Sequence, residues 1–314
     1  MRHSTIRQLE VFATAARLGS FTRTAEEMFL TQPTVSMQIK KLTDVVGLPL
    51  FEQIGKKMYL TDAGRELYRT CRGILEHLSQ FEMIAADMKG VKAGKLRLAV
   101  VTTAKYFVPR LLGSFCQQYP GIDVSLTVSN RDSILERMTD NVDDLYILSQ
   151  LPEDVDEVVQ AFLENPLVVI APVNHPLVNK KNITLKRIAQ EPFLSREYGS
   201  GTRMATEHIF SKQGLKLKVR MELGSNEAIK QAIIGGLGIS VLSRHTTALG
   251  SPMEELTELD VKGFPIDEKW YCTYPAGKQL SIVAQTFLAY LQDAPRIIVD
   301  LALSGAGIIT FPAR

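Results

Sequence analysis

The sequence predicts an α/β multidomain protein, and three observations lead to this fold class. The first 60 residues carry short helical patterns and a turn-rich segment, whereas residues 61–88 form one long helical pattern without proline. From residue 95 to about residue 291, apolar strands alternate with helices. A Gly/Lys segment, KGVKAG at 89–94, forms a hinge between the last two zones, and 314 residues are enough for two or more domains.

The charges are nearly balanced, with 36 Lys and Arg against 34 Asp and Glu and a formal net charge of +2. This balance excludes a polybasic chain and an acidic solvating tail, and a hydrophobic content of 45% is ordinary globular composition. The first 94 residues hold 13 basic and 10 acidic residues, so they are only mildly basic. Any affinity for nucleic acid must therefore come from individually placed contacts.

Cysteine usage and hydropathy indicate a reduced, soluble, cytoplasmic protein without a membrane partner. Cys71, Cys116 and Cys272 are far apart and match neither a disulfide framework nor a zinc site, so no metal is expected. The N-terminal residues have no apolar signal-peptide core. The longest apolar tract, residues 297–311, is interrupted by Asp300 and is shorter than the ~20 residues of a spanning helix. We take residues 301–314 as a C-terminal tail.

Three short helices are expected in the first domain, residues 1–60. The first ends at Gly19, Thr22 can cap the second, and a turn over residues 29–31 leads to a third helix that is capped by Thr31. The third helix has a narrow apolar stripe at spacing i, i+4, i+7 and i+11, formed by Val35, Ile39, Leu42 and Val46.

The opposite face of this third helix is short, polar and lightly basic, which suits insertion into the major groove of DNA. Its N-terminal side chains could read base edges while lysines hold phosphates. Gly47, Gly55 and Lys56-Lys57 fit a hairpin wing whose tip reaches the backbone. A solvated amphipathic helix in a small bundle is the alternative, but two preceding helices joined by a three-residue turn favour the DNA-binding interpretation.

Residues 61–88 carry the clearest periodicity in the chain, with apolar positions spaced by alternating steps of four and three. A heptad seam of this kind buries itself against another helix as a coiled coil, so we expect this linker helix to dimerise. Packing of the helix against its own domain is the alternative. The seam consists of Leu67, Cys71, Ile74, Leu78, Phe81, Ala85 and Met88.

The run from Ile6 through Leu67 resembles the winged helix-turn-helix of LysR-type transcriptional regulators. The motifs that carry the resemblance are GSF at 19–21, TQPTVS at 31–36, LF at 50–51 and LTDAG at 60–64. Gln53 departs from the pattern, because many members carry Arg there for a backbone contact. The resemblance implies promoter DNA as a partner, with DNA-binding positions at Gln32, Pro33, Thr34, Ser36, Met37, Lys40, Lys56 and Lys57.

The rest of the chain agrees with the effector domain of that family, which is similar to a periplasmic binding protein with two α/β subdomains around a cleft. We expect subdomain I at residues 95–164 and 269–300, and subdomain II at 165–268. Expected strands are 96–102, 124–128, 145–148, 166–171, 215–223, 239–242 and 270–274, and expected helices are 106–117, 134–139, 228–234, 282–291 and one after Gly201. Such alternation predicts parallel sheets, with ligands at the carboxyl ends of the strands.

Polar side chains gather at the strand-to-helix junctions of this domain. Helix N-termini favour anions, so these junctions predict a site for a carboxylate or a phosphate ester. The alternatives are that the threonines only cap helices and that Arg203 only pairs with Glu207. The predicted effector-binding residues are Thr102, Thr103, Lys105, Asn130, Arg131, Ser200, Gly201, Thr202 and Arg203.

Several C-terminal stretches, including GSGTRMATEHIF and SNEAIKQAIIGGLGISVLS, resemble the regulators of RuBisCO operons and of inorganic-carbon uptake in autotrophic bacteria, cyanobacteria especially. This resemblance implies no cofactor but a small anionic effector such as 2-oxoglutarate, 2-phosphoglycolate, ribulose-1,5-bisphosphate or NADPH. It also implies a homodimer that pairs again into a homotetramer. The alternative within the family is a regulator of an unrelated operon that responds to another organic acid.

An enzyme is the first rival class, and the sequence does not favour it. The five histidines lack HExxH or metal spacing, Ser200 lies in GSGTR rather than in a GxSxG elbow, and phosphate-loop motifs are missing. No catalytic residue is therefore predicted. A free-standing cytosolic anion-binding protein or solute-binding protein is the second rival, and the three N-terminal helices argue against it.

Overall fold

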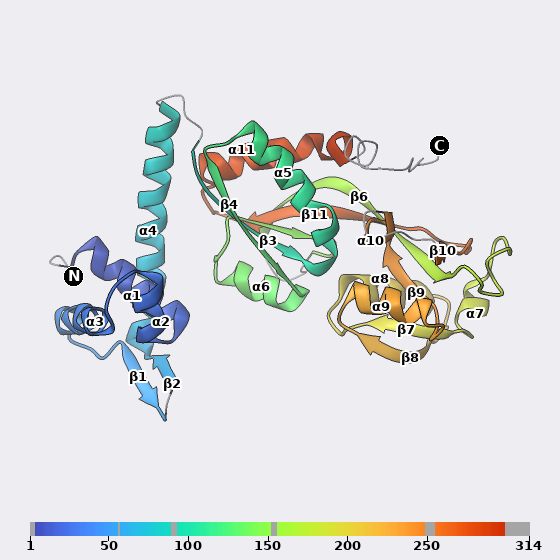
Figure 1. Ribbon diagram of the computed structural model, residues 1–314, viewed down its shortest axis with the longest axis horizontal. Coiled ribbons are helices and arrows are strands. Elements are labelled where there is room, and N and C mark those ends of the chain that lie inside the picture. The colour runs from blue at the N-terminus through green and yellow to red at the C-terminus, as the bar shows by residue number, and fades with distance from the viewer. Residues whose placement is uncertain (1–3, 56, 89–92, 152–155, 249–254, 299–314) are drawn as a thin grey trace. The chain divides into compact units, whose positions relative to one another are not determined.

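The computed structural model describes residues 4–55, 57–88, 93–151, 156–248 and 255–298 (Figure 1). The chain divides into two compact units, Met1–Lys89 and Gly90–Arg314, called here the N-terminal unit and the C-terminal unit. The elements of the N-terminal unit are α1 (Ile6–Leu18), α2 (Phe21–Glu27), α3 (Gln32–Val46), β1 (Phe51–Ile54), β2 (Lys57–Leu60) and α4 (Asp62–Met88).

Helix boundaries in the N-terminal unit follow from local capping. Helix α1 ends at Gly19, whose φ of 59° lies in the left-handed region, and the Thr31 hydroxyl accepts from the Thr34 amide at 3.4 Å to start α3. One expected cap was wrong. Ser20, not Thr22, caps α2, because Ser20 has the extended backbone that a cap requires whereas the chain is already helical at Phe21.

The three helices enclose one apolar core. Val35 and Leu42 of α3 are fully buried and Ile39 is nearly so, against Phe12 of α1. The expected apolar stripe of α3 is therefore confirmed, and burial of this stripe fixes which face of the helix remains outside.

The long helix α4 packs onto this core only through its first turns. A Cβ atom on Gly64 would lie 2.0 Å from the backbone oxygen of Leu50, so glycine permits α4 to approach the chain ahead of β1. Leu67 and Cys71 are buried in the core of their own domain, which corrects the expectation that they face a partner helix. Further along α4 (Figure 1), Ile74, Leu78 and Phe81 are 38%, 37% and 67% exposed.

The C-terminal unit is built on a seven-stranded mixed sheet in the order β10-β6-β11-β5-β3-β4, with β9 paired to β6. Strand β3 pairs in parallel with β4 and β5, whereas β6 and β11 run antiparallel to their neighbours. Subdomain I contains β3 (Gly94–Val101), the 3-10 helix η1 (Thr102–Tyr106), α5 (Val108–Gln118), β4 (Ile122–Ser129), α6 (Arg131–Thr139), β5 (Leu145–Leu148), α11 (Ile282–Tyr290) and the 3-10 helix η2 (Leu291–Asp293).

Subdomain II shares the long strands β6 (Glu157–Pro172) and β11 (Ile266–Pro275) with subdomain I (Figure 1). Alternate residues of β6 pack into two different apolar clusters, Leu167 and Val169 into one and Val168 and Ile170 into the other. The remaining elements are α7 (Leu185–Ile188), β7 (Pro192–Arg196), α8 (Gly201–Ser211), β8 (Lys218–Leu223), α9 (Asn226–Ile234), β9 (Ser240–Ser243), α10 (Arg244–Ala248) and β10 (Leu256–Glu258).

Three features of this unit differ from the expectation. The sheet is mixed rather than parallel, because two long antiparallel strands, β6 and β11, connect the subdomains. The alternation at 215–223 is a strand only from Lys218, since Leu215 and Leu217 pack against the second-subdomain core instead. The strands β7 and β10 and the short helices α7 and α10 were not expected. Strand β11 pairs with β5, and α11 contacts β3.

Candidate DNA-reading face and effector cleft

The predicted DNA-binding residues of α3 share the side of the helix that points away from the core. Gln32, Pro33, Met37 and Lys40 are exposed. Two others, Thr34 and Ser36, are partly buried, and the Thr34 hydroxyl lies 2.8 Å from the Thr31 hydroxyl in the cap of α3. This face therefore presents the ammonium group of Lys40, the amide of Gln32 and the thioether of Met37 to a DNA groove. The hydroxyls of Thr34 and Ser36 lie deeper, nearer the core.

The wing is an antiparallel hairpin in which Phe51 pairs with Leu60 and Ile54 with Lys57. Gly55 forms its turn with a φ of 63°. The side-chain nitrogen Nε2 of Gln53 donates to the Gly55 carbonyl at 3.0 Å, so Gln53 closes the hairpin tip. The predicted phosphate contact Lys56 lies outside the described residues, as does the side chain of Lys57.

Six of the predicted effector-binding residues meet at one small cavity in the C-terminal unit. They come from the ends of three elements: η1 after β3, the start of α6, and the start of α8. The cavity has a volume of about 20 Å³, enough for a single water. The six residues are Thr102, Thr103, Arg131, Ser200, Gly201 and Thr202.

Three predicted residues do not line this cavity. The ammonium group of Lys105 is exposed and lies 5.2 Å from the ring centre of Tyr106, and Asn130 caps α6 by accepting from the Ser133 amide at 3.0 Å. Arg203 pairs with Glu207 at 2.8 Å and with Glu222. Local helix geometry uses the side chains of Asn130 and Arg203, so these two expected effector contacts are corrected to structural roles. Lys105 lies outside the cavity, and its effector contact stays a prediction.

The central cation of the cleft is a residue that the sequence did not predict. Arg196 ends β7 and is 4% exposed. Its Nη1 donates to the Asn226 amide oxygen at 2.6 Å and to Thr103 at 3.4 Å, and its Nη2 donates to Thr102 at 3.2 Å. Because Arg196 and Asn226 belong to subdomain II and the threonines to subdomain I, one guanidinium joins the two walls of the cleft.

Sequence reasoning missed Arg196 because the predicted cluster at this junction begins only at Ser200 and does not extend back into the preceding strand. The usable signal was a cation two positions after the apolar pair Phe193-Leu194 and just ahead of a glycine-rich turn. At such a position a short buried strand can present a side chain to a ligand. Asn226 was missed for a similar reason. It lies in the first turn of α9 and is 2% exposed.

Close packing holds the cleft walls together. A Cβ atom on Gly201 would lie 2.9 Å from Cγ of Gln150 and 3.2 Å from the Ser149 hydroxyl, so glycine lets α8 approach subdomain I. The Tyr106 hydroxyl also donates to the Glu227 carboxylate across the cleft. Burial raises the pKa of Tyr106, and this hydrogen bond raises it further, so the phenol keeps its proton.

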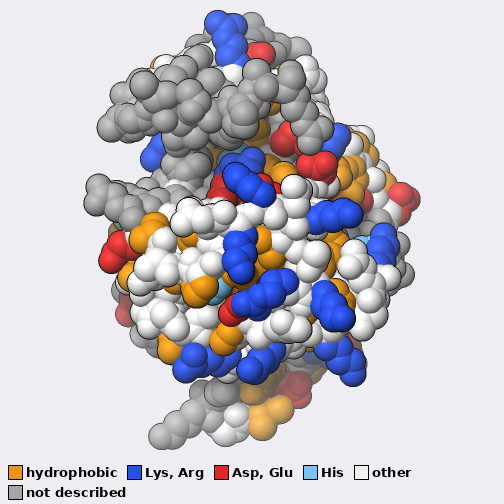
Figure 2. Space-filling view, turned by 90° about the vertical axis from the view of Figure 1, so that its right-hand side faces the viewer, with side chains coloured by type: hydrophobic (Ala, Val, Ile, Leu, Met, Phe, Trp, Pro, Cys, Tyr) orange, Lys and Arg blue, Asp and Glu red, His pale blue; other side chains and the backbone are white. Residues whose placement is uncertain are grey.

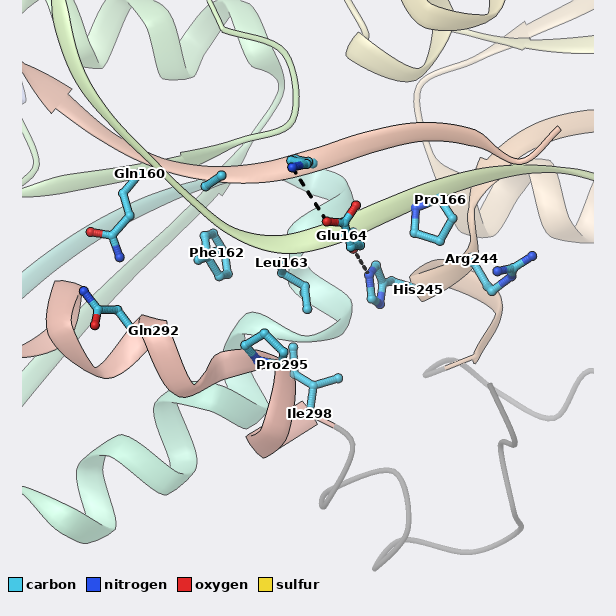
Figure 3. Close-up of a pocket in the computed structure, with 12 residues that line it drawn as sticks. Gln160, Phe162, Leu163, Glu164, Pro166, Arg244, His245, Gln292, Pro295 and Ile298 are labelled. Carbon is cyan, nitrogen blue, oxygen red and sulfur yellow. Dashed lines mark hydrogen bonds and ion pairs between the residues drawn. The ribbon is translucent and has the colours of Figure 1, made fainter. Parts of the chain in front are cut away.

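A second cavity of about 770 Å³ lies beside β6 and differs in chemistry (Figure 3). Phe162, Leu163, Pro295 and Ile298 lie around it. Its cations already have carboxylate partners, since Arg244 pairs with Glu258 at 2.9 Å and Lys269 lies 3.9 Å from Glu164.

The imidazole of His245, which lines this larger cavity, favours its uncharged form. Burial lowers the pKa of His245, and its Nε2 lies 2.8 Å from the backbone oxygen of Glu164. An anion would therefore find no uncompensated charge among these lining residues.

Most cations elsewhere on the C-terminal unit face solvent. Figure 2 shows Lys and Arg side chains scattered over one face of the molecule, with apolar, uncharged and some acidic side chains among them. Exposed charges of this kind are screened by water and salt, which sets the buried cations Arg196 and Lys230 apart from them. Within the described residues, no group of three or more His, Cys, Asp or Glu could hold a metal, and no helix is long and apolar enough to cross a membrane.

Comparison with known protein families matches both units. Residues 6–65 match the bacterial regulatory helix-turn-helix protein, lysR family, and residues 89–296 match the LysR substrate binding domain. The two matched ranges correspond to the winged helix-turn-helix and to the two-subdomain unit that contains the Arg196 cleft.

Individual relatives extend over nearly the whole chain. The HTH-type transcriptional activator CmpR of Synechocystis is 57% identical over 291 residues, 93% of this chain and 96% of that protein. A RuBisCO operon transcriptional regulator of Acidithiobacillus ferrooxidans is 49% identical, over 93% and 94% of the two chains.

A solved structure of the Synechocystis CcmR regulatory domain in complex with 2-PG aligns with a TM-score of 0.61 and 57% identity. The alignment covers 63% of this chain and 95% of that chain. With both of its units matched and relatives of this identity across its length, the chain belongs to the LysR family of DNA-binding transcriptional regulators and is not an enzyme.

Proposed function

We propose that this regulator controls genes of carbon fixation or inorganic-carbon uptake in response to a small anionic metabolite. The metabolite binds in the cleft between the two subdomains of the C-terminal unit. The observation that carries the effector site is the buried guanidinium of Arg196, surrounded by the Thr102 and Thr103 hydroxyls and the start of α8. The names of the relatives at 57% and 49% identity support the class of target genes.

The chemistry of the cleft favours an anion with a phosphate group. Arg131 adds a second cation, and its bonds to the carbonyls of Gln150 and Leu151 leave its charge uncompensated by those partners. Backbone N–H groups at the start of the 11-residue helix α8 add further donors. We take 2-phosphoglycolate as the first candidate, because a regulatory domain 57% identical to this chain was solved with 2-PG.

Helix α3 is the proposed recognition helix. Gln32, Met37 and Lys40 are exposed on one side, opposite the buried Val35 and Leu42, so the helix can enter a major groove without disturbing the core. Lys40 would hold a phosphate while the first turn of α3 reads base edges. Because promoter DNA is the target, we place the protein in the cytoplasm.

The second half of α4 is the proposed dimer contact. Ile74, Leu78 and Phe81 follow the four-and-three spacing of a coiled coil and are exposed in the single chain. The same stripe from a second copy would cover them, and Ala85 would continue the contact, whereas the side chain of Met88 lies outside the described residues. Two such dimers would pair through their effector domains into a tetramer.

The proposed mechanism couples the cleft to the spacing of the recognition helices. Effector binding changes the angle between subdomains, and the assembly then holds its promoter with a different spacing and bend. For this coupling, the effector must bind the two assemblies with different affinities.

Calorimetric titration of the full-length protein with the four candidate effectors tests the proposal. We expect 2-phosphoglycolate to bind and the other three, 2-oxoglutarate, ribulose-1,5-bisphosphate and NADPH, to bind more weakly. Lys212→Gln is the control, since this exposed lysine after α8 lies outside the cavity and its loss should leave the affinity unchanged. Absence of binding by all four anions would contradict the proposed effector class.

A further inference from the structure

A carboxylate of the protein already binds the guanidinium of Arg196, the central cation of the cleft. Glu197 directly follows Arg196, and its two oxygens accept from Nε at 2.7 Å and from Nη2 at 2.8 Å. This two-point contact uses the edge of the guanidinium that best fits a carboxylate or phosphate. Both residues line the effector cavity. The proposed anion site therefore contains an anion of its own.

The bonds of Arg196 leave no N–H group for a ligand. A guanidinium has five N–H donors, and the five bonds described here go to Glu197 twice and to Asn226, Thr103 and Thr102 once each. An incoming anion must therefore displace at least one partner. Asn226 is 2% exposed and makes the shortest bond at 2.6 Å, so it is the partner least able to leave.

Glu197 is the partner best placed to move. Its side chain is 23% exposed, compared with 4% for Arg196. It begins a turn in which the Ser200 amide donates to the Glu197 carbonyl at 3.2 Å, and Gly199 has a φ of 80°. The small volume of the cavity, about 20 Å³, points the same way, because departure of this side chain would enlarge the space beside the guanidinium.

We propose that the Glu197 carboxylate is an internal anion that occupies Arg196 until the effector displaces it. This inference rests on the proposed effector site. The exchange sets a threshold, since a ligand must compete with a tethered carboxylate. It also selects for ligand charge, because a dianionic phosphate competes for a guanidinium more strongly than a monocarboxylate does. Displacement also frees the turn ahead of α8, which links binding to the subdomain II wall.

Calorimetry on the full-length protein tests this exchange with two ligands, 2-phosphoglycolate and inorganic phosphate. Glu197→Gln keeps the shape of the side chain and removes its charge, so we expect both ligands to bind about tenfold more tightly, a change of about 1.4 kcal/mol. The matched control is Glu207→Gln, because Glu207 pairs with Arg203 on α8 outside the cavity and is 56% exposed. This control should bind both ligands as the wild type does.

The outcomes separate this inference from the proposed function. If the wild type binds 2-phosphoglycolate and Glu197→Gln binds no more tightly, the internal-anion role is overturned while the effector site stands. If the wild type fails to bind 2-phosphoglycolate but Glu197→Gln gains phosphate binding, the role stands and the proposed effector is wrong. If neither protein binds either ligand, both ideas are overturned.

A double variant shows whether the gain acts through Arg196. In the Arg196→Gln background, Glu197→Gln should give no gain for either ligand, since the guanidinium that both anions need is gone. A tenfold gain that persisted in this background would overturn the inference. Thermal melting of each variant establishes that it is folded, and Glu197→Gln should melt close to the wild type because its side chain is partly exposed.

Discussion

The two units of this regulator place their polar recognition groups in opposite environments. On α3, the side chains of Gln32 and Lys40 are exposed to solvent, on a helix whose other side packs into the core of the unit. In the C-terminal unit, Arg196 and Asn226 are 4% and 2% exposed and bonded to each other. Each exposed contact of α3 contributes a modest binding free energy that salt screens. Loss of one partner from the buried network around Arg196 instead leaves other buried polar groups without a hydrogen bond. Single substitutions should therefore have much larger effects in the cleft than on the helix.

The largest effect is expected from Arg196→Gln. Removing the charged member of a buried network costs about 3–5 kcal/mol of stability, so the melting temperature should fall. The anion also loses its central cation, so binding of 2-phosphoglycolate should fall by more than about 100-fold. Calorimetry and thermal melting measure both effects. Near-normal binding by Arg196→Gln would remove the contrast between the units.

Substitution in the exposed part of α4 should have the next largest effect. Phe81→Ser removes an aromatic side chain that is 67% exposed in the single chain, so we expect at least tenfold weaker dimerisation by analytical ultracentrifugation, with little loss of domain stability. Leu67→Ala should do the reverse, lowering the stability of the N-terminal unit by about 2–5 kcal/mol. Identical effects of the two variants would contradict the division of α4 into a first part that packs in the core and a second part that forms the dimer contact.

A smaller effect is expected on the recognition face. The double variant Ser36→Ala, Lys40→Ala should weaken promoter binding by about tenfold and reduce the salt dependence by about one phosphate contact. Fluorescence anisotropy at several salt concentrations measures both quantities. Lys212→Ala, an exposed lysine after α8, is the control that should leave them unchanged. Undiminished binding by the double variant would contradict the assignment of α3.

The smallest effect at neutral pH concerns His245. Burial lowers the pKa of this imidazole from 6.5, so below that pH the unfolded chain binds a proton that the folded chain resists. Stability should therefore fall with decreasing pH, by at most about 1.4 kcal/mol per pH unit from this group. Chemical denaturation between pH 5 and pH 7.5 should show a shallower decline for His245→Gln. An unchanged slope would mean that the imidazole does not resist protonation in the fold.

The sequence predicts best what local rules determine. Gly19 and Thr31 bound their helices as expected, and the spacing of Val35, Ile39 and Leu42 identifies the outer face of α3, because a helix buries one side. Thr102, Thr103 and Ser200 also meet as expected, since they follow the ends of β3 and β7, two strands of different sheets that face the same cleft.

The failures have a common physical cause, which is that tertiary packing decides where a side chain goes. Nothing within the heptad pattern distinguishes Leu67 and Cys71, which the winged-helix core buries, from Phe81, which stays exposed. Arg203 lies beside the predicted effector residues at the start of α8, but its guanidinium forms an i, i+4 ion pair with Glu207 instead. Arg196 depends on β7, a five-residue strand that is too short for its periodicity to identify.

The central claim is that an anion bound at Arg196 controls how the regulator holds its promoter. Fluorescence energy transfer across an end-labelled promoter fragment, with and without 2-phosphoglycolate, tests this claim most directly. The account predicts that the effector changes the DNA end-to-end distance in the wild-type complex, and that Arg196→Gln binds the same fragment without responding. An equal response in both proteins, or none in the wild type, would contradict it.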